Sequence, residues 1–379
     1  MKKILIVAGA RPNFMKIAPV LRAMERYSDV MQSILVHTGQ HYDSRMSDTF
    51  FASLGIKKPE YNLDVGSGSH AVQTAGIMIK FEEVCLSEKP DMVLVVGDVN
   101  STIATGLVAK KLHITLCHVE AGLRSGDRNM PEEINRLATD AITDLFFTTE
   151  PEGTKNLLKE GHNPKCVHFV GHVMIDNLFY QLKRLEKEAD RLVCESIRSI
   201  KRGLPKKYLC MTMHRPSNVD NKEILTGLLT AINRIASKTP IVFPCHPRTR
   251  KNIEQFGLSH LFNLDYAGIS NIQSGIIVTE PLGYDDFLYL WKDAAGVLTD
   301  SGGLQEETTA LKIPCITMRT STERPVTADV GSNEVVGIDG ERIVALAEKM
   351  LVGAWKESRI PDLWDGKASE RIVKVLLTT

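Results

Sequence analysis

Short runs of β-branched and other apolar residues alternate with longer amphipathic stretches along the whole chain. Clear examples of the apolar runs are Ile4–Val7, Met92–Val96 and Ile241–Pro244, and clear examples of the amphipathic stretches are His70–Leu86 and Pro131–Ile142. Buried parallel strands have continuous apolar sequences, and helices of roughly ten residues or more connect them in βαβ units. The pattern therefore predicts an α/β protein whose parallel sheets are covered by helices on both faces.

A long charged segment, residues 176–202, interrupts this alternation and precedes Gly203 and Pro205, so we expect one long helix that ends there. A new strand at Tyr208–Thr212 then restarts the βα pattern. We predict two doubly wound, Rossmann-like domains that face a cleft, because ligands of open α/β sheets bind outside the carboxyl ends of the strands. The expected domains are residues 1–170 with a returning helix at about 366–379, and residues 171–365.

Composition and charge narrow the classes of partner. The chain has 46 basic and 46 acidic residues, so its formal net charge is zero and it has no overall field that would attract nucleic acid or an anionic membrane. No apolar run approaches the roughly 20 residues that span a bilayer, and the first residues enter a strand rather than a signal peptide. The seven cysteines are scattered without a C-x-x-C motif, which favours reduced thiols. We expect a soluble cytoplasmic protein.

Three carboxylates follow closely on predicted strands or begin a helix in the first half of the chain. Asp98 comes just after the strand Met92–Val96, Glu120 directly follows the next strand, and Glu132 lies in the first turn of a predicted helix. Each alone would suit a turn, a cap or a helix-dipole partner. Together they predict an acid/base set at one edge of a sheet.

Two further loops of this half carry polar residues. The first strand is followed by GARPNFMKIAP, which is not a dinucleotide fingerprint, and it places Arg11 and Lys16 near a helix start. Those cations suit either an anionic group or a solvated basic face. The second loop, HTGQHYD, holds His37 and His41, but no third ligand follows at a fixed spacing, so we expect a polar loop and no metal.

The motif LTDSGGLQEE is the strongest local signal in the second half of the chain. Its glycines allow the backbone to approach a ligand closely, and the N–H groups of the following helix can hold phosphate oxygens. Glu307, about one turn into that helix, can accept hydrogen bonds from ribose hydroxyls; an ordinary tight turn is the alternative. The candidate binding residues of this motif are Ser301, Gly302, Gly303 and Glu307.

Basic side chains follow other strands of this half. His214 ends the first of them, His246 and Arg248 follow the next, and Arg324 lies in the STERP segment. Because the sequence has these cations but no magnesium-binding loop, it predicts a nucleoside diphosphate that is held by protein groups alone.

At these residues the chain resembles the non-hydrolysing UDP-N-acetylglucosamine 2-epimerases. The motifs that carry the resemblance occur in family order over nearly the whole chain: GARPNFMKIAP, HTGQH, GDVNST, HVEAGLRSG, MPEEINR, HRPSN, LTDSGGLQEE and TERP. The resemblance implies the glycosyltransferase-B architecture, with UDP bound by residues 171–365. It also implies interconversion of UDP-N-acetylglucosamine and UDP-N-acetylmannosamine without a redox or metal cofactor, and a homodimer.

The family chemistry assigns a role to each candidate residue. A base removes the C2 proton while UDP leaves C1, and UDP adds back to the 2-acetamidoglucal after the proton returns on the opposite face. By resemblance the catalytic residues are Asp98, Glu120, Glu132 and His214. The residues expected to bind UDP and the sugar are Arg11, Lys16, Phe287 (near the uracil), Ser301, Gly302, Gly303, Glu307 and Arg324.

Three alternatives remain open from the sequence. The first is a 2-epimerase of UDP-2,3-diacetamido-glucuronic acid, although Arg324 after Thr-Glu favours the N-acetylglucosamine substrate. The second is a glycosyltransferase of the same fold, which would need an acceptor groove and commonly has membrane-docking helices. The third is a non-catalytic nucleotide-sugar sensor, for which three carboxylates in one cleft would only destabilise the fold.

The sequence also departs from many bacterial members at a second, activating UDP-N-acetylglucosamine site. Those members have an Arg after the Gln-His pair, whereas this chain keeps Gln40 and His41 and continues with Tyr42 and Asp43. It also has Gly76 in a helical stretch where those members supply a further Arg. Loss of cations and gain of a carboxylate disfavour a diphosphate, so we predict weak or absent activation.

Overall fold

The computed structural model describes residues 1–39, 48–262 and 272–379. The described chain divides into two compact units, Met1–Leu178 with Asp362–Thr379, and Phe179–Pro361. Each unit is built on its own fully parallel sheet, which confirms the predicted class of two Rossmann-like α/β units. The predicted domains, residues 1–170 with 366–379 and residues 171–365, stay a prediction about which parts of the chain fold independently.

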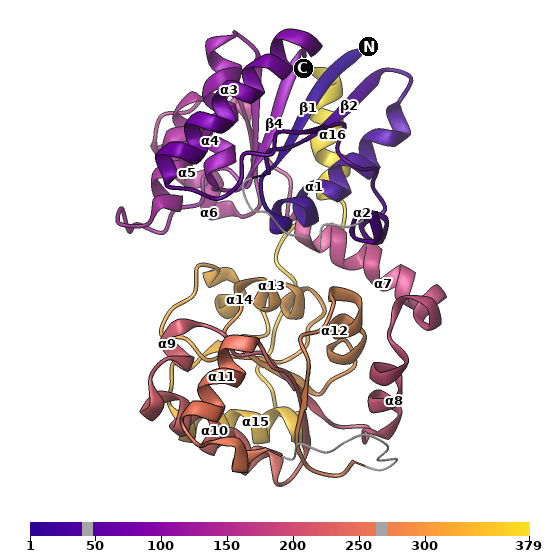
Figure 1. The fold of residues 1–379 in the computed structure, drawn as a ribbon, viewed down its shortest axis with the longest axis vertical. Helices are drawn as coiled ribbons and strands as arrows, with labels where there is room; N and C mark the ends of the chain where they lie inside the picture. The colour runs from indigo at the N-terminus through magenta and orange to yellow at the C-terminus, as the bar shows by residue number, and fades with distance from the viewer. Residues whose placement is uncertain (40–47, 263–271) are drawn as a thin grey trace. The chain divides into compact units, whose positions relative to one another are not determined.

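Within the described residues, the sheet of the first unit has seven strands in the order β3-β2-β1-β4-β5-β6-β7, and Figure 1 shows β1 between β2 and β4. The order reverses between β1 and β4, which lie side by side although β2 and β3 come between them in the sequence. Such a switch point is where ligands bind in open α/β sheets. The strands are β1 Lys2–Ala8, β2 Met31–His37, β3 Tyr61–Asn62, β4 Met92–Val96, β5 Thr115–Val119, β6 Leu145–Thr148 and β7 Val167–Phe169.

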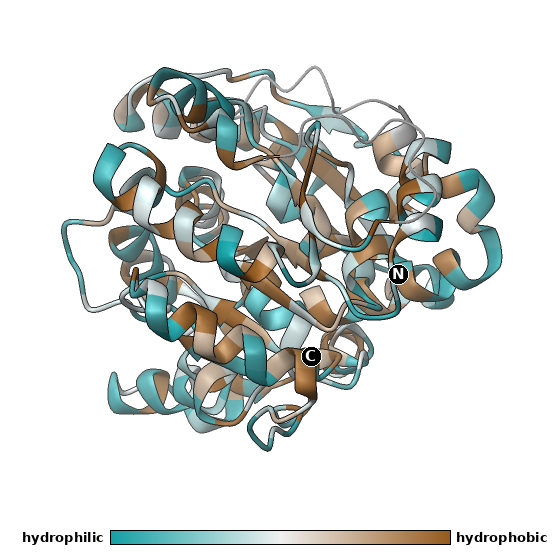
Figure 2. Cartoon of the chain, turned by 90° about the horizontal axis from the view of Figure 1, so that it is seen from below, coloured by the Kyte–Doolittle hydropathy of each residue, from teal (hydrophilic) through white to brown (hydrophobic). Residues whose placement is uncertain are grey.

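Helices cover both faces of this sheet, because alternate side chains of a strand point to opposite faces. Ile4 and Ile6 of β1 join the apolar cluster that contains α1, whereas Leu5 and Val7 join the cluster that contains α3. Strand residues accordingly appear hydrophobic in Figure 2. The helices of this unit are α1 Arg11–Met24, α2 Asp48–Leu54, α3 His70–Glu88, α4 Asn100–Lys111, α5 Pro131–Ile142, α6 Pro151–Lys159 and α16 Ala368–Thr378.

The last helix, α16, completes the core of the first unit. Its residues Ile372 and Val373 are fully buried in the cluster that α1 also lines. The Asp176 carboxylate accepts hydrogen bonds from the first backbone N–H groups of α16, those of Ala368 at 3.0 Å and Ser369 at 2.7 Å. A carboxylate at this position satisfies N–H groups that have no partner within the helix.

The sheet of the second unit has six strands in the order β10-β9-β8-β11-β12-β13, and its order reverses between β8 and β11. The strands are β8 Leu209–Met211, β9 Pro240–Pro244, β10 Gly275–Thr279, β11 Gly296–Thr299, β12 Cys315–Thr317 and β13 Asn333–Val335. The helices of this unit, apart from α7, are α8 Glu195–Gly203, α9 Pro216–Val219, α10 Lys222–Ala236, α11 Pro247–Gln255, α12 Tyr284–Trp291, α13 Gly302–Ala310, α14 Pro325–Asp329 and α15 Gly340–Val352.

The single long helix predicted over residues 176–202 is wrong. The structure has two helices there, α7 Val173–Leu192 and α8 Glu195–Gly203, and α7 is itself kinked at Glu188, whose backbone is not helical (φ −136°, ψ 23°). Cys194 between them is extended (ψ 141°), and its backbone N–H donates a 2.8 Å hydrogen bond to Asp286 at the start of α12. The apolar periodicity does not reveal this tertiary hydrogen bond, which competes with helix continuation.

Two features bear on the cellular setting. None of the helices in the described ranges is long and apolar enough to cross a membrane. All seven cysteines are unbridged thiols.

Candidate active site

A buried ion pair lies at the carboxyl end of β5 in the first unit. Lys16 Nζ of α1 is 2.5 Å from Glu120 Oε2, and the Glu120 side chain is only 3% exposed. A β-carbon at Gly97, built on that residue's positive φ of 69°, would lie 3.4 Å from Lys16 Nζ and 3.6 Å from Glu120 Oε2. Those distances are ordinary van der Waals contacts, so the positive φ, rather than lack of space, favours glycine where β4 ends. Glu120 itself has a φ of 68°, a strained conformation for a non-glycine residue of the kind found at functional sites.

Asp98, which follows Gly97, is held by two consecutive residues of α5. Arg136 Nη2 is 2.5 Å from Asp98 Oδ2, and Asn135 Nδ2 donates to the Asp98 backbone carbonyl at 2.9 Å. The Asp98 side chain keeps 28% of its surface exposed. A substrate can therefore reach this carboxylate although both its side chain and its backbone are fixed. The structure thus brings Asp98, Glu120 and Lys16 to the ends of neighbouring strands.

The two glutamates at the start of α5 have different surroundings. Glu133 is buried and accepts hydrogen bonds from the backbone N–H groups of Ser125 at 2.9 Å and Gly126 at 3.2 Å, and from Arg136 at 2.9 Å. Burial opposes ionisation of Glu133, but these donors outweigh it and lower its pKa. Glu132 is exposed, and among the described residues it has no hydrogen bond or ion pair. The structure therefore leaves Glu132 accessible and gives Glu133 a supporting position.

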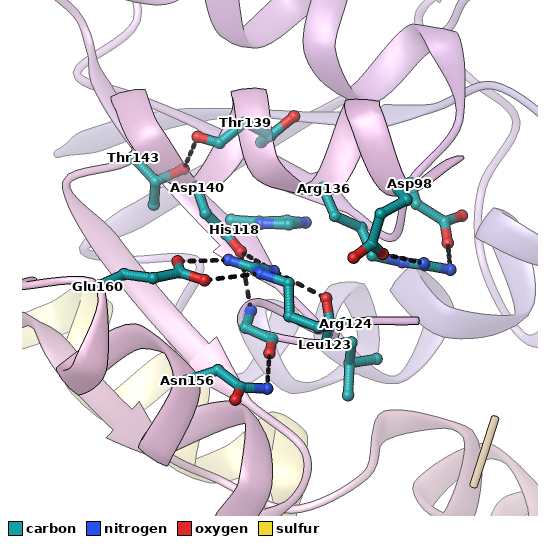
Figure 3. A network of polar contacts seen from close by, with 12 residues as sticks. Asp98, His118, Leu123, Arg124, Arg136, Thr139, Asp140, Thr143, Asn156 and Glu160 are labelled. Carbon is teal, nitrogen blue, oxygen red and sulfur yellow. Dashed lines mark hydrogen bonds and ion pairs between the residues drawn. The ribbon is translucent and has the colours of Figure 1, made fainter. Parts of the chain in front are cut away.

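A second polar network, drawn in Figure 3, adjoins these residues. His118 of β5 is fully buried, with Nδ1 2.7 Å from Asp140 Oδ1. The other Asp140 oxygen is 2.8 Å from Arg124, whose guanidinium also pairs with Glu160 at 2.7 Å. This chain of charges connects α5 to α6 through the end of β5.

The remaining predicted residues of this unit are Arg11, residues 40–43 and Gly76. Arg11 is the first residue of that helix, and its guanidinium lies over the ring of Phe50, 5.0 Å from the centroid, in cation–π geometry. Gln40, His41, Tyr42 and Asp43, which carry the prediction about a second site, lie outside the described residues. The backbone at Gly76 is helical, and a β-carbon there would meet Val65 at 3.1 Å.

In the second unit, a buried carboxylate organises the switch point between β8 and β11. Asp300 is fully buried, and its Oδ2 accepts the backbone N–H groups of His214 and Arg215, both at 2.8 Å. His214 Nδ1 is 3.0 Å from Asp300 Oδ1, and the His214 side chain is 42% exposed. Burial opposes ionisation of Asp300, but His214 and the two N–H groups outweigh it and lower its pKa. Because Asp300 orients the His214 ring through Nδ1, the other ring nitrogen, Nε2, is available for a substrate.

The start of α13 has the properties of an anion site. The helix begins at Gly302, and the preceding Ser301 makes no side-chain capping hydrogen bond. A β-carbon at Gly303 would meet no atom within 4 Å, so the space beside the first turn is open. Backbone N–H groups at such a terminus bind phosphate oxygens well.

Glu307 and Phe287 belong to two helices that are joined by a hydrogen bond. The Tyr284 hydroxyl of α12 donates to Glu307 Oε1 of α13 at 2.6 Å. Phe287 lies one turn further along α12. Glu307 is 5% exposed, so its carboxylate is held in place at the edge of the site.

Arg324, the last predicted residue, comes just before α14 and forms an ion pair with the buried Glu306 of α13. Its backbone N–H donates to the Thr322 hydroxyl at 3.0 Å, and that hydroxyl donates to Gln305 of α13 at 2.7 Å. The loop that carries Arg324 is thus fastened to the helix whose N-terminus forms the candidate phosphate site.

Several residues that hold the site were given no role from sequence. Arg136 could have been recognised because it lies four residues after Glu132, one helical turn along the same face. Asp300 could have been recognised as the carboxylate directly before the Ser-Gly-Gly turn. His118 and Asp140 are 22 residues apart, and no local pattern connects them.

The chain is similar to known proteins over nearly its whole length. The family model described as UDP-N-acetylglucosamine 2-epimerase matches residues 22–377. A UDP-N-acetylglucosamine 2-epimerase of Methanococcus maripaludis is 45% identical over 353 residues, covering 93% of this chain and 92% of the relative. The UDP-2,3-diacetamido-2,3-dideoxy-D-glucuronate 2-epimerase of Pseudomonas aeruginosa is 38% identical and covers 99% of both chains.

A solved structure is similar over the same length. The Methanocaldococcus jannaschii UDP-GlcNAc 2-epimerase, crystallised with UDP-GlcNAc and UDP, has 41% sequence identity, covers all of both chains and gives a TM-score of 0.80. The fold, two parallel-sheet units with charged residues after their strands, is consistent with the family that the family model and the full-length relatives indicate. The chain belongs to the UDP-N-acetylglucosamine 2-epimerase family.

Proposed function

We propose that this protein interconverts UDP-N-acetylglucosamine and UDP-N-acetylmannosamine by elimination and re-addition of UDP. The observation that carries the proposal is the pair of fixed carboxylates at neighbouring strand ends, Glu120 beside Lys16 and Asp98 beside Arg136. The names of the relatives, and the UDP-GlcNAc and UDP bound to the M. jannaschii enzyme, support the substrate class.

The chemistry explains why more than one carboxylate is needed. The C2–H bond of the sugar is not activated, so a base must take the proton as the C1–O bond to UDP breaks and the C1=C2 double bond of 2-acetamidoglucal forms. In the second half, a proton is delivered to the opposite face of C2 and UDP re-forms its bond to C1. Asp98, Glu120 and Glu132 are the proposed proton donors and acceptors, since such groups contribute about 10²–10⁴-fold each.

The second unit supplies the proposed groups for the diphosphate and the nucleoside. His214, the open first turn of α13 and Arg324 offer donors to the negative charge that develops on the departing UDP. Glu307 is the proposed acceptor for the ribose hydroxyls, and Phe287 is the proposed neighbour of the uracil. Arg11 and Lys16 of the first unit complete the proposed set.

Incubation with UDP-N-acetylglucosamine in D₂O, followed by proton NMR, tests the reaction. The expected product is UDP-N-acetylmannosamine with deuterium at C2, together with a trace of free UDP. Full retention of the C2 proton in the product would contradict the elimination route. Glu120→Gln, which removes the carboxylate and keeps the side-chain size, is the matched control and should form no deuterated product over the same time.

The same assay separates the alternatives. The P. aeruginosa relative makes UDP-2,3-diacetamido-2,3-dideoxy-D-glucuronate the second substrate to test. We expect kcat/KM to be higher for UDP-N-acetylglucosamine. UDP release that depends on an added sugar acceptor would instead indicate a glycosyltransferase.

We further propose that the protein is a homodimer. Val72, Ile79 and Leu86 of α3 are 65%, 64% and 59% exposed, and their seven-residue spacing places them on one face of the helix. Light scattering with size-exclusion chromatography should give a dimer for the native chain and a monomer for Ile79→Asp. Leu158→Asp on α6, a residue 42% exposed, is the control and should remain dimeric.

The seven unbridged thiols support the proposed cytoplasmic location.

A further inference from the structure

The fully buried imidazole of His118 stands between two oxygen atoms. Its Nδ1 is 2.7 Å from Asp140 Oδ1, and its Nε2 is 2.8 Å from the backbone carbonyl oxygen of Gly97. A carbonyl oxygen can only accept a hydrogen bond, and an ionised carboxylate can only accept one as well. Burial opposes ionisation of Asp140, but His118, Arg124 and the Gly122 N–H outweigh it and lower its pKa, so this carboxylate is ionised. Both ring nitrogens of His118 then carry hydrogen, and the ring is an imidazolium.

From this arrangement we propose that His118 is a positioning residue, a doubly donating imidazolium that fixes the Gly97–Asp98 peptide and thereby orients the Asp98 carboxylate for proton transfer at C2. This inference rests on the proposed epimerase function. It concerns a residue that does not itself touch the substrate.

The surrounding charges are consistent with a buried cation. Asp140 faces the ring from α5, and its second oxygen accepts the Gly122 N–H at 3.0 Å and pairs with Arg124 at 2.8 Å. Glu120 at the end of β5 adds a further negative charge that favours the cation, and Glu160 neutralises Arg124. Burial lowers the pKa of His118, but Asp140, the Gly97 carbonyl and Glu120 outweigh burial and raise it.

The link to Asp98 runs through one peptide group. The Gly97 carbonyl belongs to the peptide that joins Gly97 to Asp98, so a hydrogen bond to this oxygen sets the plane from which the Asp98 side chain departs. The Gly97 N–H is held in turn by Val119 at 3.1 Å. With these two hydrogen bonds the turn after β4 has little freedom to rotate.

Helix α5 connects all of these contacts. Asn135 and Arg136 hold Asp98 directly, and Asp140, one helical turn after Arg136, holds His118. The same helix therefore holds Asp98 in two ways: directly through Asn135 and Arg136, and indirectly through Asp140, His118 and the Gly97 carbonyl. Since misplacement of a reacting group by about 1 Å costs about 10²-fold in rate, such double support has a measurable effect.

Two substitutions separate positioning from charge. His118→Phe removes both hydrogen bonds but keeps a ring of similar size, and we expect kcat to fall about 10²-fold while KM stays within about threefold. In Asp140→Asn the amide can donate to Nδ1 of a neutral ring, so the Nε2–H bond to Gly97 survives and we expect a smaller fall, below about tenfold. His168→Phe on β7 is the matched control and should keep native kcat.

A spectroscopic readout does not depend on activity. In native protein labelled with ¹⁵N-histidine, one ring should keep both nitrogens protonated above the ordinary histidine pKa of about 6.5, and in Asp140→Asn that ring should become neutral there. A neutral, titrating ring in place of this signal in the native protein would overturn the proposal. This measurement also decides the matter if His118→Phe does not fold.

The kinetic outcomes are equally decisive. A kcat of His118→Phe within about threefold of native would overturn the positioning role. An equal loss in Asp140→Asn would also overturn it, because charge rather than the Gly97 hydrogen bond would then matter. Failure of the proposed function is distinguishable: the native protein would not exchange the C2 hydrogen, whereas the NMR signal of the protonated ring would be unaffected.

Discussion

Lys16 and Glu120 lie 104 residues apart in the sequence, yet their ammonium and carboxylate groups meet at 2.5 Å. The pair fastens α1, which follows β1, to the end of β5. Since β1 and β5 lie on opposite sides of β4 in the sheet, this one contact spans the switch point. The candidate acid/base residues are therefore arranged around the switch point of the sheet.

Substitutions at the two members of this ion pair should have different main effects, one on stability and the other on catalysis. Lys16→Met leaves a buried carboxylate without its cation, and we expect the free energy of unfolding to fall by about 3 kcal/mol. Glu120→Gln should instead lower kcat at least about 10²-fold. Urea denaturation and steady-state kinetics measure the two effects. Lys155→Met, which removes a pair whose side chains are 74% and 60% exposed, should change neither.

Asp98→Asn should lower kcat at least about 10²-fold, because it removes a proposed proton-transfer group. UDP binding, which we assign to the second unit, should be unchanged in isothermal titration. Near-native turnover would remove Asp98 from the catalytic set.

Glu132 and Glu133 are neighbours with contrasting expected effects. Glu132→Gln should reduce kcat at least about 10²-fold without a change in Tm, since the side chain is exposed and makes no hydrogen bond or ion pair within the described chain. Glu133→Gln should lower Tm, because Glu133 accepts hydrogen bonds from two N–H groups and from Arg136. A fall in Tm for Glu132→Gln, or native turnover, would show that the exposed carboxylate has no catalytic role.

Asp300 predicts a pH dependence of stability. Because the pKa of Asp300 is lowered in the folded protein, its ionised form contributes stability above the ordinary aspartate pKa of about 4, and this contribution is lost as the pH falls through the lower folded value. Asp300→Asn should therefore cost about 1–3 kcal/mol at pH 7, and the difference from native should narrow below about pH 4. A difference that stays constant over a urea-denaturation series from pH 7 to 3 would contradict this assignment.

Arg324→Ala should weaken UDP binding about 10- to 100-fold, the usual value of a charge-assisted hydrogen bond. Isothermal titration with UDP measures the change. Arg342→Ala, at an arginine whose side chain is 51% exposed, is the control and should bind UDP normally. Equal affinity in the two variants would exclude Arg324 from the diphosphate site.

The alternation of apolar runs and amphipathic stretches was sufficient to predict the parallel α/β class, because continuous apolar sequences such as β4 are nearly specific for buried strands. Short edge strands gave weaker signals. Tyr61–Asn62 and Asn333–Val335 have only two and three residues, and they pair at the sheet edges through backbone hydrogen bonds that sequence pattern does not encode. The break between α7 and α8 was missed for the same reason, since a tertiary hydrogen bond from Cys194 causes it.

The candidate site was predictable to the extent that its residues closely follow strands. Glu120 directly follows its strand, and Asp98, His214 and Ser301 come within three residues of a strand end. The carboxyl end of each parallel sheet brings the residues that follow its own strands to one edge. The residues that orient them lie on helices that long connecting segments separate from these strands. Arg136 and Asp140 of α5 reach Asp98 and His118 only once the helix has packed, so their roles became visible in the structure.

The packing of α16 has a consequence for folding during translation. Ala368–Thr378 complete the core beside α1, yet they are synthesised after every residue of Phe179–Pro361. Although domains generally fold from the N-terminus during synthesis, we expect the first unit to complete its core only when these last residues are available.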